Sequence, residues 1–396
     1  MKTVRLGAIA ESLPCDYGDD PTDEAPAFDV VKVSNVSGDG QFHGDFEKRR
    51  FRDNQLANLL VKEGELLVVK SSGSKANILS GKTAICGEDR AGRIVASNFL
   101  LRLRVDEAAA VPRFLWYVLN SGASKAFVKT IVGASTYPNL KWSLYASHPI
   151  PLPPLAEQRR IAEVLDRAEA LRAKRRSTLA QLDSLTQSLF LDLFGDPVSN
   201  PKRWPRHRLG EVAQKITDGE HLNPEFSTSG MPIVMAGNVL DERIDLDNAK
   251  SVEWELGKRF RKKCDPEPGD LLLVSRGATI GRQCVVGSAH DFCLMGSVIL
   301  IKPSKERVDS RFLSTFLRHP VSQSALYRTS GSSAQQAIYL KDLQNLNCVL
   351  PPIDLQHEFA RQVTAVEKLK MAQRASLAEL DALFATLQHR AFRGEL

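Results

Sequence analysis

Residues 76–83 are the stretch whose residue types and spacing come nearest to a catalytic motif. The run Ala-Asn-Ile-Leu-Ser-Gly-Lys-Thr satisfies a relaxed phosphate-loop pattern, in which Lys82 and Thr83 would hold the phosphates of a nucleotide. Such a loop must open a helix, because the helix N-terminus binds the phosphates. The residues that follow are typical of a strand and a turn instead. A nucleotide-binding enzyme using Lys82 and Thr83 is therefore only an alternative.

Other side chains that could perform catalysis or bind a metal do not have the required spacing. The histidines are scattered, without the HxxxH or Cys/His spacing of a zinc site, and no GxSxG motif of a hydrolase occurs. The six cysteines form no CxxC pair and are expected to be reduced, as in a cytoplasmic protein. The sequence therefore predicts no catalytic residue, no metal site and no cofactor for this chain.

The composition is that of a globular protein with more than one domain. The chain has 396 residues, of which 43% are hydrophobic and 25% are charged. No run of 18 apolar residues occurs, so no membrane span is predicted. The formal net charge is +6, and the positive excess lies outside the two long helices described next. This charge permits a nucleic-acid partner without requiring one.

Two long segments, near-copies of each other, are the elements that would position any binding residues. Residues 152–194 and 350–392 align without a gap at an offset of 198 and share the start Leu-Pro-Pro. Neither contains a further Gly or Pro until Gly195 and Gly394. Each segment is therefore predicted to form one helix, about 38 residues and roughly 55 Å long.

The apolar residues of the two predicted helices recur at three- and four-residue steps. Such a stripe forms a seam that can pack a partner helix, and two such seams in one chain most simply face each other. Near the middle of both helices the stripe turns polar, at Arg175 and Thr178 and at the matching Gln373 and Ser376. A solvated gap and a polar layer that fixes the register both explain this. The predicted seam residues are Ile161, Ala168, Leu171, Leu182, Leu185, Leu189, Phe359, Val366, Leu369, Leu380, Leu383 and Leu387.

The segments that precede the two helices are also copies of each other. Arg-Leu-Gly at residues 5–7 matches residues 208–210, and a turn glycine leads into the short apolar runs 64–69 and 269–274. These runs are typical of buried strands, and residues 113–115 and 311–313 are typical of short helices. The predicted fold class is α+β, with two repeated, mainly-β domains that carry small helices and are separated by the two long helices. The loops between the matched positions differ, which fits two modules that bind different targets; sequence drift after the duplication also explains the difference.

The order of these segments resembles a known family. The chain begins with a globular half, which is followed by a helix that starts Leu-Pro-Pro-Leu-x-Glu-Gln-x-x-Ile (residues 152–161). A second globular half and a degenerate copy of that helix come next. This order is similar to that of the specificity (S) subunit of type I restriction-modification enzymes. The resemblance covers essentially the whole chain. The second copy departs from the pattern, with Leu355 and Phe359 replacing the usual Glu and Ile.

The resemblance implies a function and a set of partners. Residues 1–148 and 196–346 would be target-recognition domains that read a bipartite, asymmetric site on double-stranded DNA. Residues 149–195 and 347–396 would carry the family's conserved helices, which form an antiparallel coiled coil. Methylation (M) subunits, which bind S-adenosylmethionine, and restriction (R) subunits, which use ATP and Mg²⁺, would dock there. The chain itself would be a non-catalytic, cytoplasmic subunit that directs adenine methylation or cleavage by these partners.

The candidate DNA-reading residues lie in the divergent polar loops of each half. Arg and Lys pair with guanine, Asn and Gln with adenine, and Ser and Thr with either base or with phosphate. Each candidate could instead be an ordinary solvated loop residue; Arg276 is favoured because it directly follows a buried strand. The candidates are Ser71, Ser72, Ser74, Lys75, Asn77, Lys82, Ser135, Thr136, Tyr137, Ser275, Arg276, Thr279, Arg282, Ser332, Ser333, Gln335 and Gln336.

Basic clusters at residues 48–52 and 259–263 occupy comparable places in the two halves. They could contact phosphate groups, and a solvated face explains them equally well. The basic run 174–176 lies in the middle of the first long helix, where a solvent-facing stripe is the usual explanation. A coiled-coil scaffold whose domains bind protein rather than DNA is a further alternative.

Overall fold

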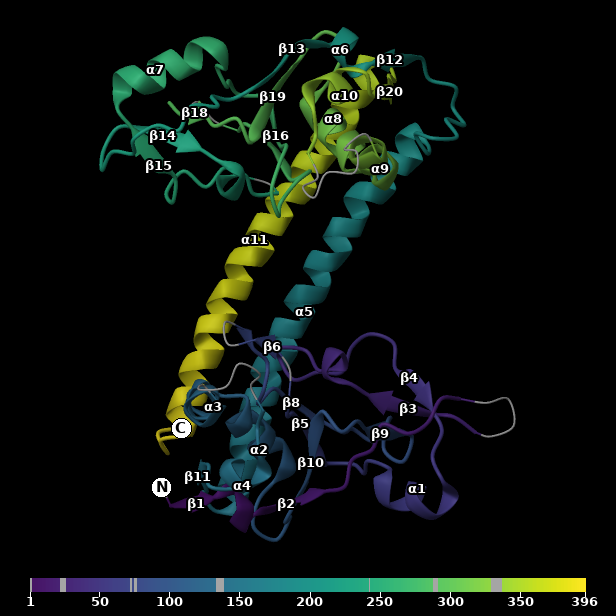
Figure 1. The fold of residues 1–396 in the computed structure, drawn as a ribbon, viewed down its shortest axis with the longest axis vertical. Helices are drawn as coiled ribbons and strands as arrows, with labels where there is room; N and C mark the ends of the chain where they lie inside the picture. Colours follow the sequence, from purple (N-terminus) through teal and green to yellow (C-terminus); the bar gives the residue numbers. More distant parts are fainter. Residues whose placement is uncertain are drawn as a thin grey trace. The chain divides into compact units, whose positions relative to one another are not determined.

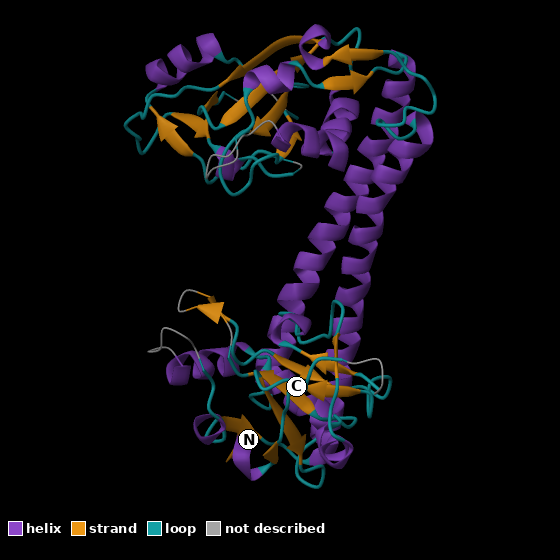
Figure 2. Cartoon of the chain, turned by 45° about the vertical axis from the view of Figure 1, so that its right-hand side comes forward, coloured by secondary structure: helices purple, strands orange, loops and turns teal. Residues whose placement is uncertain are grey.

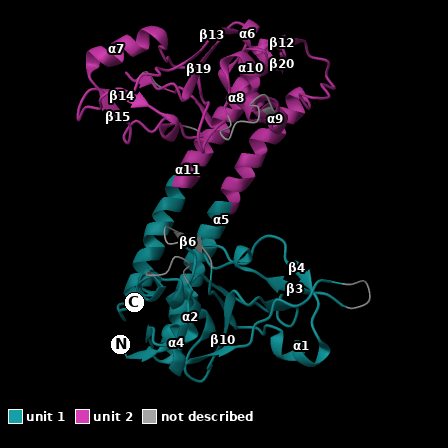
Figure 3. Ribbon diagram, viewed as in Figure 1, with its two compact units in different colours: residues 1–176, 375–396 teal, residues 177–374 magenta. Residues whose placement is uncertain are grey.

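The structure is a computed structural model that describes residues 2–21, 26–71, 73–74, 77–132, 139–241, 243–287, 291–328 and 337–396, with side chains left out at 73, 74, 77 and 328. The chain divides into two compact units (Figure 3). The first unit comprises residues 1–176 and 375–396, and the second unit comprises residues 177–374. Each unit contains strands, short helices and part of the two long helices (Figure 2).

The first unit is built on two small sheets. An antiparallel sheet has the strand order β2-β10-β5-β8, and a second sheet has the order β4-β3-β9, in which β3 and β9 are parallel (Figure 1). Two further pairs are β1 with β11 and β6 with β7. The strands are β1 (Thr3–Arg5), β2 (Ala10–Leu13), β3 (Phe28–Val31), β4 (Glu47–Arg49), β5 (Leu66–Val69), β6 (Gly73–Ser74), β7 (Asn77–Ile78), β8 (Thr83–Ile85), β9 (Ile94–Ala96), β10 (Leu100–Val105) and β11 (Pro149–Pro151).

The second unit repeats this topology strand for strand. Its antiparallel sheet has the order β13-β19-β16-β17, its second sheet has the order β15-β14-β18 with β14 and β18 parallel, and β12 pairs with β20. The first unit has an additional hairpin, β6–β7, between β5 and β8, the strands that correspond to β16 and β17 of the second unit. The strands are β12 (Arg206–Arg208), β13 (Ala213–Asp218), β14 (Met231–Val234), β15 (Lys250–Val252), β16 (Leu271–Val274), β17 (Gln283–Val285), β18 (Cys293–Leu294), β19 (Val298–Pro303) and β20 (Asn347–Val349).

Short helices connect these strands. Three single-turn 3₁₀ segments lie at Leu6–Ala8, Val33–Asn35 and Ala236–Asn238. The short α-helices are α1 (Asp53–Leu59), α2 (Pro112–Leu119), α3 (Gly122–Val132), α4 (Trp142–Tyr145), α6 (Leu209–Val212), α7 (Trp254–Lys263), α8 (Ser310–Arg318), α9 (Pro320–Arg328) and α10 (Leu340–Gln344).

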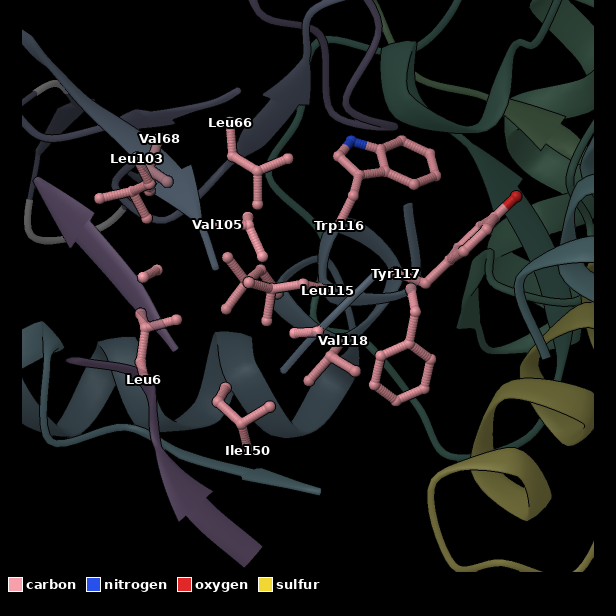
Figure 4. Packing of buried hydrophobic residues seen from close by; sticks show 14 of the residues in the cluster. Leu6, Leu66, Val68, Leu103, Val105, Leu115, Trp116, Tyr117, Val118 and Ile150 are labelled. Carbon is pink, nitrogen blue, oxygen red and sulfur yellow. The ribbon is translucent and has the colours of Figure 1, made fainter. Parts of the chain in front are cut away.

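The continuous apolar runs in the sequence are the central strands, which are buried on both faces. Leu66 and Val68 of β5 belong to the core beneath α2 (Figure 4), whereas Leu67 and Val69 belong to the core of the second sheet. β16 divides its four residues between two cores in the same alternating way. Side chains of a strand alternate between its faces, so a strand with apolar layers on both sides needs an unbroken apolar sequence.

The long helices α5 (Leu155–Phe194) and α11 (Ile353–Ala391) run antiparallel in both units. In the first unit, Leu165 near the start of α5 belongs to the core against which Leu387 near the end of α11 packs. In the second unit, Phe190 near the end of α5 packs with Phe359 near the start of α11, with ring centroids 5.8 Å apart. Two ion pairs related by the offset of 198 join the helices: Arg172 to Asp381 in the first unit and Lys370 to Asp183 in the second, each at 2.6 Å.

The packing row differs in part from the predicted seam. Ile161, Ala168, Phe359 and Val366 are buried and Leu182, Leu189, Leu380 and Leu387 are half-buried, but Leu171, Leu185, Leu369 and Leu383 are 54%, 41%, 53% and 49% exposed. An α-helix of 3.6 residues per turn drifts by about 20° per heptad relative to a strict 3.5-residue repeat, so one apolar row cannot stay in contact along the whole helix. These four leucines therefore lie outside the helix–helix contact, although the sequence pattern predicted them to be part of it.

Two buried glutamines attach the long helices to their domains. The Gln158 side chain accepts a hydrogen bond from the Val111 amide at 2.8 Å and donates to the carbonyls of Ala109 and Pro153. Gln356 repeats all three bonds, with the amide of Asp309 and the carbonyls of Arg307 and Pro351. Both side chains are fully buried. The Pro-Pro-x-x-x-Gln start of each helix is therefore a docking motif that recognises the backbone before α2 or α8.

We expect Gln356→Ala to destabilise the second unit by about 1–3 kcal/mol, because the substitution leaves buried backbone groups without hydrogen-bond partners. Urea denaturation of the purified chain measures this loss. Gln181→Ala is the matched control, because Gln181 is exposed on α5 in the same unit. An equal effect of both substitutions would contradict the anchoring role.

Candidate nucleic-acid interface

In each half the fold brings the start of one predicted DNA-reading loop to the residues that follow the other. In the first unit the chain leaves β5 and forms an antiparallel bridge between Ser71 and Asn139, and the Leu140 amide donates to the Lys70 carbonyl at 2.8 Å. In the second unit Arg276 bridges to Ala337, and the Ile338 amide donates to the Ser275 carbonyl at 2.9 Å. The loop after the central strand therefore meets the segment before α4 or α10 in both units.

Many of the predicted reading residues lie outside the described part of the chain. Ser74 and Asn77 are described by backbone only, in β6 and β7. The predicted residues outside the described ones are Ser72, Lys75, Ser135, Thr136, Tyr137, Ser332, Ser333, Gln335 and Gln336.

Lys82 and Phe99 mark the described part of the interface in the first unit. Both line one surface hollow, together with Lys32. Phe99 is 55% exposed, and its carbonyl accepts hydrogen bonds from the amides of Lys70 (2.9 Å) and Ser71 (3.3 Å), which hold it beside the loop that follows β5. An exposed aromatic ring beside Lys82 can contact a thymine methyl group while the lysine binds guanine or phosphate. Lys32 is paired with Glu47 at 2.6 Å. Sequence reasoning missed Phe99; its position before the apolar run of β10 was the available signal.

Arg276 is the corresponding residue in the second unit. It is exposed and lines a small surface pocket of about 240 Å³ together with Tyr339 and Asp218. Burial raises the pKa of Asp218, but hydrogen bonds from His221 and Lys263 outweigh it and hold this pKa below its ordinary value. An ionised carboxylate therefore lines the same pocket as the Arg276 side chain. Tyr339, 48% exposed, was not singled out from the sequence.

The other described candidates of the second unit differ in accessibility. Thr279 and Arg282 are half-buried in the turn that contains Gly277, whose φ of +94° favours glycine. Ser275 is only 3% exposed, because it continues the buried strand β16 and its backbone is hydrogen-bonded to residues 297 and 338. This burial argues against its side chain as a base-reading group.

Carboxylates pair with much of the two basic clusters. Arg49 contacts Asp20 and Glu47 and lies over the Tyr17 ring, 4.3 Å from its centroid. In the second unit Arg261 pairs with Asp265 and Asp291, and Lys263 pairs with Asp218. The basic run in α5 likewise supplies Arg176, which bonds to Glu169 at 2.9 Å. These pairs favour a structural role for Arg49, Arg176, Arg261 and Lys263 over phosphate contact.

The phosphate-loop alternative is wrong. Lys82 and Thr83 lead into strand β8, not into a helix, and Thr83 pairs with Val68 of the central strand. The Thr83 side chain is fully buried and donates to the Gly81 carbonyl at 3.0 Å. No helix N-terminus is therefore available at this loop to bind phosphates.

The side chains and helices of the described residues meet the requirements of neither a metal site nor a membrane-spanning helix. In that part of the chain, no group of three or more His, Cys, Asp or Glu side chains could hold a metal ion. No helix there is long and apolar enough to cross a membrane.

The fold occurs twice, and in each copy the chain after the central strand meets the segment before α4 or α10. Two such copies, each containing part of the long helix pair, define a class of DNA-specificity proteins. The family model described as "Type I restriction modification DNA specificity domain" matches residues 58–181 and 201–380. The chain belongs to this family and is a specificity subunit of the type I class.

Individual relatives agree with this assignment. The chain is 25% identical over 335 residues to the type I restriction enzyme EcoBI specificity subunit of Escherichia coli, covering 74% of this chain and 68% of that protein. It is 22% identical over 377 residues to the EcoKI specificity subunit of Escherichia coli K12, covering 85% and 77%.

Solved structures show the same fold. A chain from a structure on complex assembly and conformational transition of the type I R-M system has a TM-score of 0.52 and 22% identity, covering 100% of this chain and 98% of that one. The S subunit of the type I restriction-modification system from M. genitalium has a TM-score of 0.58 and 13% identity, covering 99% and 96%.

Proposed function

We propose that this chain reads a bipartite, asymmetric sequence on double-stranded DNA, and that it directs adenine methylation or cleavage by partner subunits while catalysing neither. The observation that carries the proposal is the repeat itself: one topology occurs twice, and the loops that differ most lie at the same place in both copies. A repeat with equal loops would read a symmetric site, as homodimers do. Unequal loops suit two different half-sites.

We further propose a division of labour along the chain. Residues 1–148 and 196–346 act as the two target-recognition domains, and residues 149–195 and 347–396 act as the helical regions that assemble the complex. The buried glutamines support this division, since each ties a helix start to the domain before it through backbone atoms. S-adenosylmethionine and ATP with Mg²⁺ would then be bound by the partner subunits.

The exposed leucines of the long helices are the proposed contact points for methylation subunits. Leu171 and Leu383 belong to the first unit, and Leu185 and Leu369 belong to the second. The offset of 198 relates Leu171 to Leu369 and Leu185 to Leu383, so the duplication supplies the same pair of leucines to each unit. Equivalent exposed leucines in the two units suit two copies of one partner. Restriction subunits would join the same assembly.

The proposal is tested by sequencing the adenine methylome of a host that contains this chain and its cognate methylation subunit. We expect methylation at sites that consist of two fixed half-sites and an unread spacer. This methylation should disappear when the chain is removed. Methylation that persists without the chain, or that marks one continuous motif, would refute the proposal. A protein-binding scaffold that does not touch DNA would give no chain-dependent methylation.

Arg276→Ala is expected to weaken DNA binding and methylation at one half-site by about ten-fold or more, because a side chain that reads a base contributes about 1–3 kcal/mol of discrimination. Sequence preference at one position of that half-site should relax. Arg259→Ala, which removes an exposed positive charge from α7, is the control for a general loss of charge. The same uniform loss in both variants would show that Arg276 does not read sequence.

A further inference from the structure

A cavity in the second unit occupies a place that aromatic side chains fill in the first unit. The cavity has a volume of about 680 Å³ and lies between α8 and the parts of α5 and α11 that belong to the second unit. Its lining includes Thr186, Ser314, Thr315, Arg311 and Lys370. A volume of this size is in the range of known ligand sites.

The duplication identifies the residues of the first unit that correspond to this lining. At the offset of 198, Trp116 and Tyr117 of α2 correspond to Ser314 and Thr315 of α8, and Phe384 of α11 corresponds to Thr186 of α5. The alignment is structural as well, because Gln158 and Gln356 bond to the amides immediately before α2 and α8. All three aromatic residues are thus replaced by hydroxyl side chains.

The first unit fills the equivalent space with packed aromatic rings and with cations that lie over them. The Trp116 and Tyr117 rings lie 4.6 Å apart (Figure 4), and the Tyr117 and Phe384 rings lie 6.1 Å apart. The Arg113 guanidinium lies 4.3 Å from the Trp116 centroid, and the Arg172 guanidinium lies 4.4 Å from the Phe384 centroid. Cations over aromatic faces attract the electron-rich ring, most strongly where water is excluded.

The second unit keeps both cations but has none of the three rings. Arg311 and Lys370 correspond to Arg113 and Arg172, and both line the cavity. Arg311 donates to the Thr364 hydroxyl at 2.9 Å, and Lys370 pairs with Asp183 at 2.6 Å. These contacts hold the two cations at the cavity wall. Phe190 and Val363 add apolar surface to the lining, as an aromatic occupant requires.

We propose that this cavity receives an aromatic side chain from another protein chain, the methylation subunit that the proposed function assigns as partner. Two cations complement the negative face of a ring. The hydroxyls of Thr186, Ser314 and Thr315 can bond to a phenol O–H or an indole N–H. The first unit supplies its own rings at this place, so the inserted side chain is a contact of the second unit alone. A partner that docks twice therefore docks with an additional anchor at one of its two sites.

The test fills the cavity with the residues of the first unit. The double variant Thr186→Phe/Thr315→Tyr should fold and melt at or above the wild-type temperature, because the same residues pack in the first unit. Its affinity for one of two methylation subunits, measured by calorimetry and native mass spectrometry, should fall by about ten-fold or more, since buried aromatic anchors dominate interface energies. Ser184→Phe, on the exposed part of α5 two residues from Thr186, is the matched control. A filled, folded variant that binds both subunits normally would overturn the proposal.

A small probe tests the cavity separately from the partner. Saturation-transfer NMR should detect p-cresol, the side-chain analogue of tyrosine, on the wild-type chain; the signal should disappear in the filled variant and on addition of the methylation subunit. Cresol bound equally in the presence of that subunit would show that the natural occupant is a free aromatic molecule, and would overturn the proposal. The two proposals can fail separately. If the chain did not direct methylation but the subunit still displaced cresol from it, the proposed function would be refuted and the assignment of the cavity would stand.

Discussion

Replacing Arg102 by alanine is expected to destabilise the first unit by about 3–5 kcal/mol, because the substitution leaves a buried carboxylate without its main partner. Arg102 and Glu65 are 1% and 2% exposed, and Arg102 Nε donates to Glu65 Oε2 at 2.6 Å. The other guanidinium nitrogens donate to the carbonyls of Asn58 and Leu60, both at 2.7 Å. Arg102 thereby joins β10 to the end of α1 as well as to the loop before β5.

The measurement is urea denaturation together with hydrogen exchange resolved by mass spectrometry. Exchange should accelerate in peptides of residues 1–132 and stay unchanged in those of residues 201–328. Arg104→Ala is the matched control, because Arg104 also bonds to Glu65, at 2.9 Å, but its side chain is 42% exposed. Such exposed pairs contribute about 1 kcal/mol or less. Equal losses in the two variants would show that the buried pair does not hold the unit together.

The second unit uses a different solution at the same place. Leu300 of β19 occupies the position of Arg102, since it pairs with Leu272 as Arg102 pairs with Leu67. Lys302, at the position of Arg104, pairs there with Asp270 at 2.8 Å and with Glu267 at 2.9 Å. The buried carboxylate is kept as Asp270, which is 5% exposed, so only the buried arginine is replaced and Lys302 is the cation that pairs with the carboxylate there.

Regular elements were predictable because their local signals agree with the fold. The absence of Gly and Pro after each double proline predicted helices that the structure shows at Leu155–Phe194 and Ile353–Ala391. The apolar runs after Gly64 and Gly269 became the central strands β5 and β16. Each signal is short-range and is not overridden by tertiary contacts.

The tertiary details were not predictable, because they depend on which side of an element meets a neighbour. The exposure of Leu171 and Leu369 follows from the drift of an apolar row around a long helix. The burial of Gln158 and Gln356 follows from backbone groups in the preceding domain, which no periodicity reveals. The cavity lies where hydroxyl side chains replace three aromatic rings, which no local pattern in either half reveals. The recurrence of both glutamines at the offset of 198 was the one available clue to their role.

Exchanging residues 201–348 for the corresponding segment of another family member is expected to change one half-site of the DNA target and leave the other unchanged. The exchanged segment contains the variable loops of the second unit, while Gln356 and the long helices stay. Gln356 contacts that segment through the Asp309 amide and the Arg307 carbonyl. Backbone groups are the same in every sequence, so this anchor should accept a foreign domain.

One side-chain contact limits which donor segments will function. Phe312 lies inside the exchanged segment and packs against Phe190 and Phe194, with ring centroids 5.6 Å and 4.8 Å away. A donor with Phe at this position should assemble normally, whereas a donor with Ala there should lose about 3–5 kcal/mol through the cavity it leaves. Methylome sequencing of the chimera reads both half-sites at once. The reciprocal exchange of residues 1–148, whose anchor is Gln158, should change the other half-site alone; if either exchange altered both half-sites, the two units would not read DNA independently.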